Sequence, residues 1–307
     1  MAMPQLRTVT LPVLPGARPR DSDLDLFGLT HPGKVRHENQ DHFLLATLHR
    51  QLAVHGTSLP EASRLETRSE RLATVMLVAD GVGGGTAGGE ASRIAAETVT
   101  RYATSTMQCL HFAAGGDERV LMESLHEAAL QAHEAVRAES TVRLSGEQQE
   151  AGHQPMATTL TLAIAMWPWL YVLQVGDSRC YHFCGGELRQ ITRDQTVVQA
   201  LVDAGVMTQH AAARSPFSNV LASSIGGEAM PVVSRLDIHE RGCVVLLCSD
   251  GLTKHVADDE IAQQCDAMDS SEQLCRNLLD LALERGGIDN ITILAGRALP
   301  SAGPVRA

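Results

Sequence analysis

The amino-acid sequence predicts an α+β fold in which β-sheets form a sandwich and helices occur in pairs. Short apolar runs with strand-like alternation follow one another directly, as in 157–165, 169–175 and 179–183. Helical spacing of apolar residues occurs instead in two neighbouring segments, 91–104 and 118–139. Because strands and helices do not alternate as βαβ units, an antiparallel arrangement is favoured over a parallel sheet.

Chain length and continuity predict one domain. The chain has 307 residues, of which 44% are hydrophobic, so it can bury a substantial core. No linker or internal repeat divides it into two parts with separate cores. We therefore expect an irregular N-terminal leader over 1–22, a single domain over 23–298 and a C-terminal tail over 299–307.

Charge and hydropathy argue against two kinds of partner. Asp and Glu total 36 against 25 for Lys and Arg, and the formal net charge of -11 disfavours binding to nucleic acid. The N-terminal stretch lacks the apolar centre of a signal peptide, and no run approaches the roughly 20 apolar residues that span a bilayer. We expect a cytoplasmic protein with no nucleic-acid or membrane partner.

The first elements are two strands that enclose a polar loop. Alternation predicts strands at 25–30 and 42–48. The loop between them carries Arg36 and Asp41, a cation suited to phosphate and a carboxylate suited to a metal ion. Taken alone, a polar loop of this kind is more often only a loop. The polar segment 47–71 is expected to form a long excursion between paired strands.

The chain is organised around the place where an apolar strand meets glycine-rich sequence and then a helix. The run 72–79 is stopped by Asp80 and Gly81, so Asp80 is expected at the carboxyl end of a buried strand. Five glycines within 83–89 permit close approaches that a Cβ would forbid, and Glu90 is expected to open the helix with an acidic first turn. An isolated Asp-Gly pair is more often a turn than a site.

The rest of the chain alternates between expected strands and short helices. Asp258, Asp259 and Ser270 precede apolar helical patterns and suit helix N-termini. We expect strands at 188–192, 232–238, 244–248 and 291–295, and helices at 197–204, 260–267 and 271–284.

The seven cysteines are scattered, without the dense spacing of a secreted disulfide scaffold. Reduced and mostly buried thiols are therefore expected. Cys180, His182 and Cys184 alternate along one expected strand and would share a face, as the ligands of a metal site do. With no fourth ligand in view, ordinary packing is the favoured interpretation.

Aspartates beside glycine recur at strand ends. Asp80, Asp177 and Asp250 each end an apolar strand, and Asp289 directly precedes the last one. Antiparallel topology can bring these ends to one rim, where crowded carboxylates require cations. Oxygen ligands select Mg²⁺ or Mn²⁺ over zinc, and two such ions would clamp a phosphoryl group and acidify a bridging water. The set predicts phosphoester hydrolysis; because convergence is assumed, four separate turns are the alternative.

Eight ordered segments between Asp25 and Gly296 carry a family resemblance. They read GKVRHENQD at 33–41, VADGVGGGTAGGEAS at 78–92, ATT at 157–159, VGDSRCY at 175–181, LRQITRDQTVVQALVDAG at 188–205, SNVLASSIGG at 218–227, LLCSDGL at 246–252 and GGIDNIT at 286–292. Together they resemble the bacterial metal-dependent serine/threonine protein phosphatases of the PPM, or type 2C, family. The resemblance implies a central sandwich of two antiparallel β-sheets flanked by pairs of α-helices.

The resemblance also implies a metal site of two Mn²⁺ or Mg²⁺ ions with a weaker third. Asp80 would bridge two ions, with the Gly81 carbonyl on one of them. Asp250 and Asp289 would bind the other, and Asp177 would share a third ion with Asp250.

Further groups around the metals follow from the same resemblance. Asp41 would hold metal-bound water, Arg36 would bind the substrate phosphate, and Asn290 would support the loop of the last ligand. The segment 194–217 corresponds to a mobile flap beside the site, where phosphoprotein could be contacted.

The implied reaction is hydrolysis of phosphoserine and phosphothreonine in one step. A metal-bridging water or hydroxide would attack phosphorus in line, without a phosphoenzyme, so Ser178 and Ser249 are not expected to be nucleophiles. The implied partners are phosphoproteins in signal transduction, including a cognate serine/threonine kinase or its substrates, and the protein is expected to be a monomer.

Three residues depart from the family pattern. Gln40 stands where many relatives have glutamate, so a neutral amide replaces an anionic contact to metal-bound water and is expected to loosen one metal. Val82 stands where relatives carry histidine or methionine, so water is expected to protonate the leaving group. Ala157 replaces a glycine, with a local packing effect expected.

Two other functions remain open. The substrate could be a small phosphoester, because specificity is set by the flap and surface rather than by the metals. The chain could instead be a pseudophosphatase that binds phosphoprotein or scaffolds a kinase, although its metal aspartates are all present. A nucleotide cradle is disfavoured, since no Gly-Lys-Ser/Thr follows the glycines.

Overall fold

The structure is a computed structural model that describes residues 18–52, 67–83, 86–112, 118–145 and 156–300. Several sequence predictions therefore fall wholly or partly outside the described residues. They are most of the expected leader, the middle of the polar excursion, two of the five glycines and the tail beyond residue 300.

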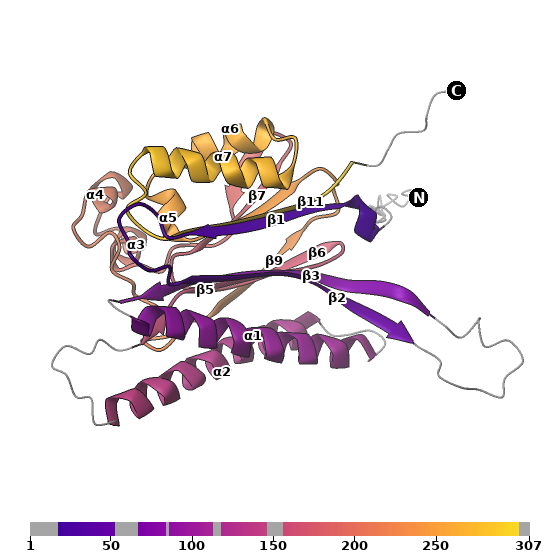
Figure 1. Cartoon of the computed structure of the whole chain (residues 1–307), viewed down its shortest axis with the longest axis horizontal. Coiled ribbons are helices and arrows are strands. Elements are labelled where there is room, and N and C mark those ends of the chain that lie inside the picture. Colours follow the sequence, from indigo (N-terminus) through magenta and orange to yellow (C-terminus); the bar gives the residue numbers. More distant parts are fainter. Residues whose placement is uncertain (1–17, 53–66, 84–85, 113–117, 146–155, 301–307) are drawn as a thin grey trace, which may run out of the picture.

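Two antiparallel sheets lie face to face, which confirms the predicted α+β sandwich (Figure 1). The first sheet has the strand order β1-β11-β10-β7-β8, and the second has β2-β3-β5-β6-β9, with β4 paired to β3. The strands are β1 (Leu24–His31), β2 (Asp41–Leu52), β3 (Thr67–Val82), β4 (Ala157–Thr158), β5 (Leu160–Met166), β6 (Trp169–Val175), β7 (Arg179–Cys184), β8 (Glu187–Gln190), β9 (Val232–Asp237), β10 (Val244–Cys248) and β11 (Ile291–Ala298).

Helices cover the outer face of each sheet. Helices α1 and α2 lie against the second sheet, and α6 and α7 lie against the first, while α3, α4 and α5 gather at one end of the sandwich (Figure 1). In the described part of the chain, no helix combines the length and hydropathy that a membrane crossing requires. Their bounds are α1 (Thr86–Phe112), α2 (Glu118–Ser145), α3 (Val197–Asp203), α4 (Gln209–Ala213), α5 (Asp250–Thr253), α6 (Asp258–Asp266) and α7 (Ser271–Glu284); a short 3-10 helix spans Asp21–Asp23.

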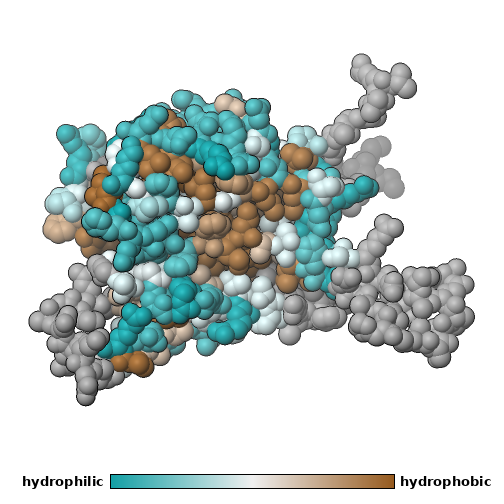
Figure 2. All heavy atoms as spheres, viewed as in Figure 1, coloured by the Kyte–Doolittle hydropathy of each residue, from teal (hydrophilic) through white to brown (hydrophobic). Residues whose placement is uncertain are grey.

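Strand alternation divides the apolar residues among three layers of core. In β3, Val75 and Leu77 face α1 and α2, whereas Met76 and Val78 face the other sheet. The predicted run 72–79 is therefore buried on both faces, as expected. Each fully buried side chain of this kind contributes roughly 1.5–3 kcal/mol. Figure 2 shows hydrophobic residues gathered between the layers and hydrophilic ones over much of the outer helices.

Helix α1 begins at Thr86, earlier than the predicted start at Glu90, and has no acidic residue in its first turn. The first turns instead contain glycine because the helix start lies against β3. A Cβ on Gly81 would lie 2.4 Å from the carbonyl carbon of Gly88, and one on Gly88 would lie 3.0 Å from that of Gly81. The glycines thus permit a close contact between helix and strand.

Helix α2 is also longer than predicted. Helical spacing predicted a helix over 118–139, yet the helix continues to Ser145. No glycine or proline interrupts the chain until Gly146, and Arg143 pairs with Glu139 one turn earlier at 3.3 Å. Polar composition alone therefore placed the boundary too early.

The expectation of reduced cysteines was wrong for one pair. Cys184 and Cys243 form a disulfide between neighbouring strands, with their Cα atoms 4.5 Å apart. They are 59 residues apart in sequence, so spacing gave no sign of the pairing. Four other cysteines are free and buried, as expected: Cys180, Cys248, Cys265 and Cys275.

Candidate metal centre

The predicted site residues meet at one cavity, which we call the carboxylate cavity. It has a volume of about 840 Å³ and lies where several strands end. Lining side chains come from segments far apart in the sequence, and the aspartates do not occupy separate turns. The predicted residues among the lining are Arg36, Asp80, Gly81, Asp177, Asp250, Asp289 and Asn290.

Asp80 is held by the second sheet and by the segment after β4. It lies opposite Asp41 in the pairing of β2 with β3. The backbone N–H of Thr159 and the hydroxyl of Thr158 both donate to the Asp80 carbonyl at 2.8 Å, and the Asp80 N–H donates to the Thr159 hydroxyl at 3.1 Å. The pair of threonines therefore fixes the backbone from which the carboxylate projects.

Asp41 is buried behind the cavity, and only one of its two carboxylate oxygens has hydrogen-bond partners among the described residues. Its Oδ2 accepts hydrogen bonds from the hydroxyls of Ser249 at 2.8 Å and Thr292 at 2.7 Å. Its Oδ1, and Oδ1 of Asp250, have no hydrogen-bond partner among the described residues. Buried carboxylate oxygens without partners are rare in folded proteins and suit ligation of a cation or of its water.

Ser178 and Ser249 are both fully buried. Ser249 donates to Asp41, and the Ser178 hydroxyl hydrogen-bonds that of Thr159 at 2.8 Å. Both serines therefore support neighbouring groups.

Lys254 is a cavity residue that sequence reasoning missed. Its ammonium lies 2.6 Å from Oδ2 of Asp250 and 2.7 Å from Oδ2 of Asp289. The short helix α5 starts at Asp250, which places Lys254 one turn later on the same side. A lysine four residues after a strand-ending aspartate was the available signal.

Arg36 reaches the cavity from the loop between β1 and β2. Its guanidinium forms two contacts with Asp289, from Nε to Oδ1 at 2.8 Å and from a terminal nitrogen to Oδ2 at 3.0 Å. More than half of the side chain is exposed. This forked geometry also matches a phosphoryl group, because phosphate presents two oxygens in the same way.

Asn290 ties that loop to the start of β11. Its side-chain amide donates to the carbonyls of Pro32 at 3.0 Å and Glu38 at 2.9 Å, and its Oδ1 accepts from the Gln40 N–H at 2.9 Å. Its backbone N–H donates to Oδ1 of Asp289 at 3.0 Å. One side chain thus fixes the loop of Arg36 relative to a candidate metal ligand.

The carboxylates perturb one another strongly. Burial, reinforced by neighbouring carboxylates, raises the pKa of Asp80 well above its ordinary value. Burial, then Asp250, raises the pKa of Asp177 to about 8, and burial raises that of Asp41 to about 6. Burial also raises the pKa of Asp250. A divalent cation would relieve this repulsion and keep the carboxylates ionised, so the donor set fits hard metal ions.

Asp289 differs from the other carboxylates. Burial acts to raise its pKa, but hydrogen bonds from Arg36 and Lys254 outweigh burial and lower it. Burial acts to lower the pKa of Lys254, but Asp250 and Asp289 raise it. Arg36 and Lys254 therefore outweigh burial at Asp289, whereas burial prevails at Asp80, Asp177 and Asp250.

The segment predicted as a flap is anchored beside the cavity. The backbone N–H of Gln195 donates to the Gly176 carbonyl at 3.0 Å, and the Gly176 N–H donates to the Gln195 side chain at 2.8 Å. Arg179 holds Asp194 at 2.7 Å. These contacts connect the base of the segment to the backbone next to Asp177.

The two-sheet sandwich and its carboxylate cavity define a class of proteins built to bind divalent metal ions at one end of a β-sandwich. Within that class, the family model described as Protein phosphatase 2C matches residues 62–283. The chain belongs to this family, as its motifs predicted.

Named relatives agree with this assignment. The chain is 32% identical over 222 residues to "Serine/threonine protein phosphatase PstP" of Mycobacterium tuberculosis, a match that covers 72% of this chain and 40% of PstP. It is 29% identical to "Serine/threonine phosphatase stp" of Listeria welshimeri, covering 86% of this chain and 92% of that protein. The chain thus matches well under half the length of PstP.

A solved structure shares both fold and sequence. It is the catalytic domain of PstP in complex with two manganese ions, with a TM-score of 0.66, 26% identity, and coverage of 90% of this chain and 99% of that one. The metal ions in that structure agree with the family's dependence on such ions.

Proposed function

We propose that this chain is a protein serine/threonine phosphatase that requires Mn²⁺ or Mg²⁺. The observation that carries the proposal is the convergence of Asp80, Asp177, Asp250 and Asp289 on one cavity. Oδ1 of Asp250 and Oδ1 of Asp41 lack hydrogen-bond partners among the described residues. Hard divalent ions are the cations that such a donor set selects.

Each candidate ligand has a proposed role. Asp80 would bind two ions, one of them together with the Gly81 carbonyl and the other together with Asp250 and Asp289. Asp177 would share a weaker third ion with Asp250, while Asp41 would act through water. When bound, such ions supply charge to phosphoryl oxygens and lower the pKa of a coordinated water.

Arg36 orients the substrate in this proposal. Its guanidinium lines the cavity, and two of its nitrogens contact the carboxylate of Asp289. On substrate binding it would exchange Asp289 for two oxygens of the phosphoryl group, which neutralises charge and aligns phosphorus for attack from the cavity floor.

The proposed partners are phosphoserine and phosphothreonine proteins, including a cognate kinase or its substrates, encountered in the cytoplasm. The phosphatase relatives support this assignment. We also propose a monomer whose residues 23–298 form one phosphatase domain.

Hydrolysis of a phosphothreonine peptide tests the proposal. Phosphate release would be measured with Mn²⁺, with Mg²⁺ and with EDTA for the native chain, for Asp250→Asn and for the matched control Asp280→Asn on the exposed face of α7. We expect metal-dependent release that is lost in Asp250→Asn and retained in Asp280→Asn.

Two other outcomes point to the other functions. Release from p-nitrophenyl phosphate, but from no phosphopeptide, would indicate a small-phosphoester hydrolase. A folded chain that binds metal and phosphopeptide without releasing phosphate would indicate a phosphoprotein-binding scaffold.

A further inference from the structure

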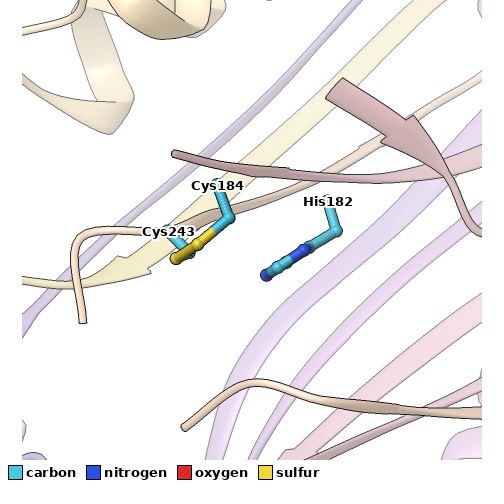
Figure 3. A group of neighbouring side chains, drawn as sticks. All are labelled: His182, Cys184 and Cys243. Carbon is cyan, nitrogen blue, oxygen red and sulfur yellow. A yellow bond between two sulfur atoms is a disulfide. The ribbon is translucent and has the colours of Figure 1, made fainter. Parts of the chain in front are cut away.

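A second group of metal-binding side chains lies away from the carboxylate cavity. It consists of His182, Cys184 and Cys243, and we call it the thiol cluster (Figure 3). Strand pairing creates it: β7 and β10 run antiparallel with His182 opposite Val245, so the next positions on the same face are Cys184 and Cys243. The cluster is thus positioned by the pairing of these strands, with Cys243 directly before β10.

Cys180, His182 and Cys184 were expected to share one face of a strand. Of these three, only His182 and Cys184 belong to the thiol cluster. Cys180 is fully buried between the sheets, packed with Val245 and Leu247, and serves the core. Cys243, directly before the neighbouring strand β10, is the second cysteine of the thiol cluster.

The spacing of donor atoms suits a tetrahedral ion. One ligand atom from each of the three residues lies within 4.8 Å of the others. In a tetrahedral zinc site, bond lengths of about 2.3 Å to sulfur and 2.0 Å to nitrogen place ligands roughly 3.3–3.8 Å apart. A small side-chain adjustment therefore brings all three donors to one ion.

Glu240 offers a fourth donor. Its Oε2 lies 3.2 Å from the sulfur of Cys184. Glu240 and Cys243 also border a cavity of about 70 Å³ between the sheets, which leaves room for the adjustment. Glu240 is therefore a candidate fourth ligand beside the thiol cluster, which the sequence alone did not show.

The imidazole of His182 has an unsatisfied nitrogen. Nε2 is buried and has no hydrogen-bond partner among the described residues. The ring extends from β7 toward the two sulfur atoms (Figure 3). Burial, with Arg189 nearby, lowers the pKa of His182 and favours the neutral ring that can bind a metal.

We propose that the reduced chain binds one Zn²⁺ through His182, Cys184, Cys243 and Glu240. Thiolate and imidazole are the ligands that zinc prefers, whereas Mg²⁺ and Mn²⁺ prefer the oxygen donors of the carboxylate cavity. The site goes beyond the proposed phosphatase function and uses none of its residues.

The disulfide and the zinc site are alternative states of the same two sulfurs. A thiol reductant passes two electrons to the S–S bond, which opens to two protein thiols while two reductant thiols form their own disulfide. Zinc then binds both sulfurs as thiolates, and two protons are released. In a reducing compartment Cys184 and Cys243 remain thiols, so the zinc-bound state is favoured over the disulfide.

Cobalt binding to the full chain tests the proposal. The chain is reduced with a phosphine, which forms a phosphine oxide with oxygen from water and binds metals weakly. After chelation, it is moved without oxygen into excess Mg²⁺ and titrated with Co²⁺. We expect thiolate charge-transfer and tetrahedral d–d absorption that saturates at about one equivalent and is displaced by Zn²⁺.

Variants separate this site from other thiols and from the carboxylate cavity. Cys184→Ser and Cys243→Ser should lose the thiolate absorption, and His182→Asn should weaken Zn²⁺ binding by at least about tenfold, since even loss of an outer partner costs about 10–100-fold. Cys265→Ser and Asp250→Asn, folded by circular dichroism, should titrate like the native chain.

The proposal is overturned if the reduced, folded native chain shows no thiolate absorption. It is also overturned if His182→Asn binds Zn²⁺ as tightly as the native chain, or if the disulfide form gives the same titration. None of these measurements uses phosphate release, so failure here is distinct from failure of the phosphatase proposal.

Discussion

The strands β7 and β10 place different kinds of donor atom at their two ends. At one end, Asp177 precedes β7 and Asp250 follows β10, both lining the carboxylate cavity. At the other end, about 20 Å away at 3.3 Å per residue, Cys184 closes β7 and Cys243 precedes β10. One pair of strands in one register therefore positions hard oxygen donors at one end and soft sulfur donors at the other.

The difference teaches that strand register supplies proximity, whereas donor chemistry selects the ion. At the carboxylate end, neighbouring carboxylates reinforce burial in raising pKa values, so the group is stable only with cations nearby. At the thiol end, two sulfurs can instead bond to one another, so the group has an uncharged resting state. The carboxylate end depends on metal, and the thiol end depends on redox state.

The largest expected effect comes from removing a charge at the carboxylate end. Asp80→Asn should lower kcat/KM for a phosphothreonine peptide by at least about 10²-fold, because loss of a bridging ligand removes several kcal/mol of metal-assisted stabilisation. Steady-state kinetics with saturating Mn²⁺ would measure it. The same variant should keep native cobalt absorption at the thiol cluster; loss of both properties would show that the two ends are not independent.

The next effect concerns stability at the thiol end. Under oxidising conditions Cys184→Ser should lower the free energy of unfolding by roughly 2–4 kcal/mol, because the disulfide closes a loop across a separation of 59 residues. Urea denaturation would measure it. With reductant and a zinc chelator present, native chain and variant should become nearly equal. An undiminished difference would mean that the serine acts through packing.

Lys254 tests whether protein cations compete with metal. Lys254→Met should tighten Mn²⁺ binding by about tenfold, or about 1.4 kcal/mol, because the ammonium contacts two candidate ligands, Asp250 and Asp289. Calorimetric titration would show it without reference to activity. Lys254→Arg retains the charge and should bind like the native chain. Weaker binding in Lys254→Met would show that the lysine positions the ligands instead.

The smallest expected effect is at Gln40. Gln40→Glu introduces the anion that the family resemblance implies at this position, and we expect Mn²⁺ binding to tighten by about threefold at low ionic strength, since the added charge acts through water. Zinc binding at the thiol cluster should stay the same. A titration of each metal against this variant would detect an unexpected coupling between the ends.

Local patterns predicted most strands well. The bounds of β6 and β10 agree with the sequence prediction, because each is a short apolar run buried on both faces and flanked by turn residues. The start of α1 was wrong since its glycines act through a tertiary contact with β3, which propensity does not include.

The site residues that lie in recognisable sequence motifs could be predicted. Asp80, Asp177 and Asp250 were each marked by glycine at the end of a strand, and Asp289 by its place directly before one; the resemblance supplied their grouping. Cys243 and Lys254 were missed for different reasons. The partner strand of Cys184 cannot be read from local sequence, and the ammonium of Lys254 reaches the aspartates only through the turn of α5.

The pairing of β1 with β11 has a consequence for protein synthesis. Residues 24–31 are made early, yet they pair with 291–298, and Asn290 joins the early loop of Arg36 to Asp289. On the ribosome, the first sheet stays open along one side of β10 until this late segment has left the exit tunnel. The carboxylate cavity therefore assembles only after translation of nearly the whole described chain, so a stalled nascent chain lacks a complete metal centre.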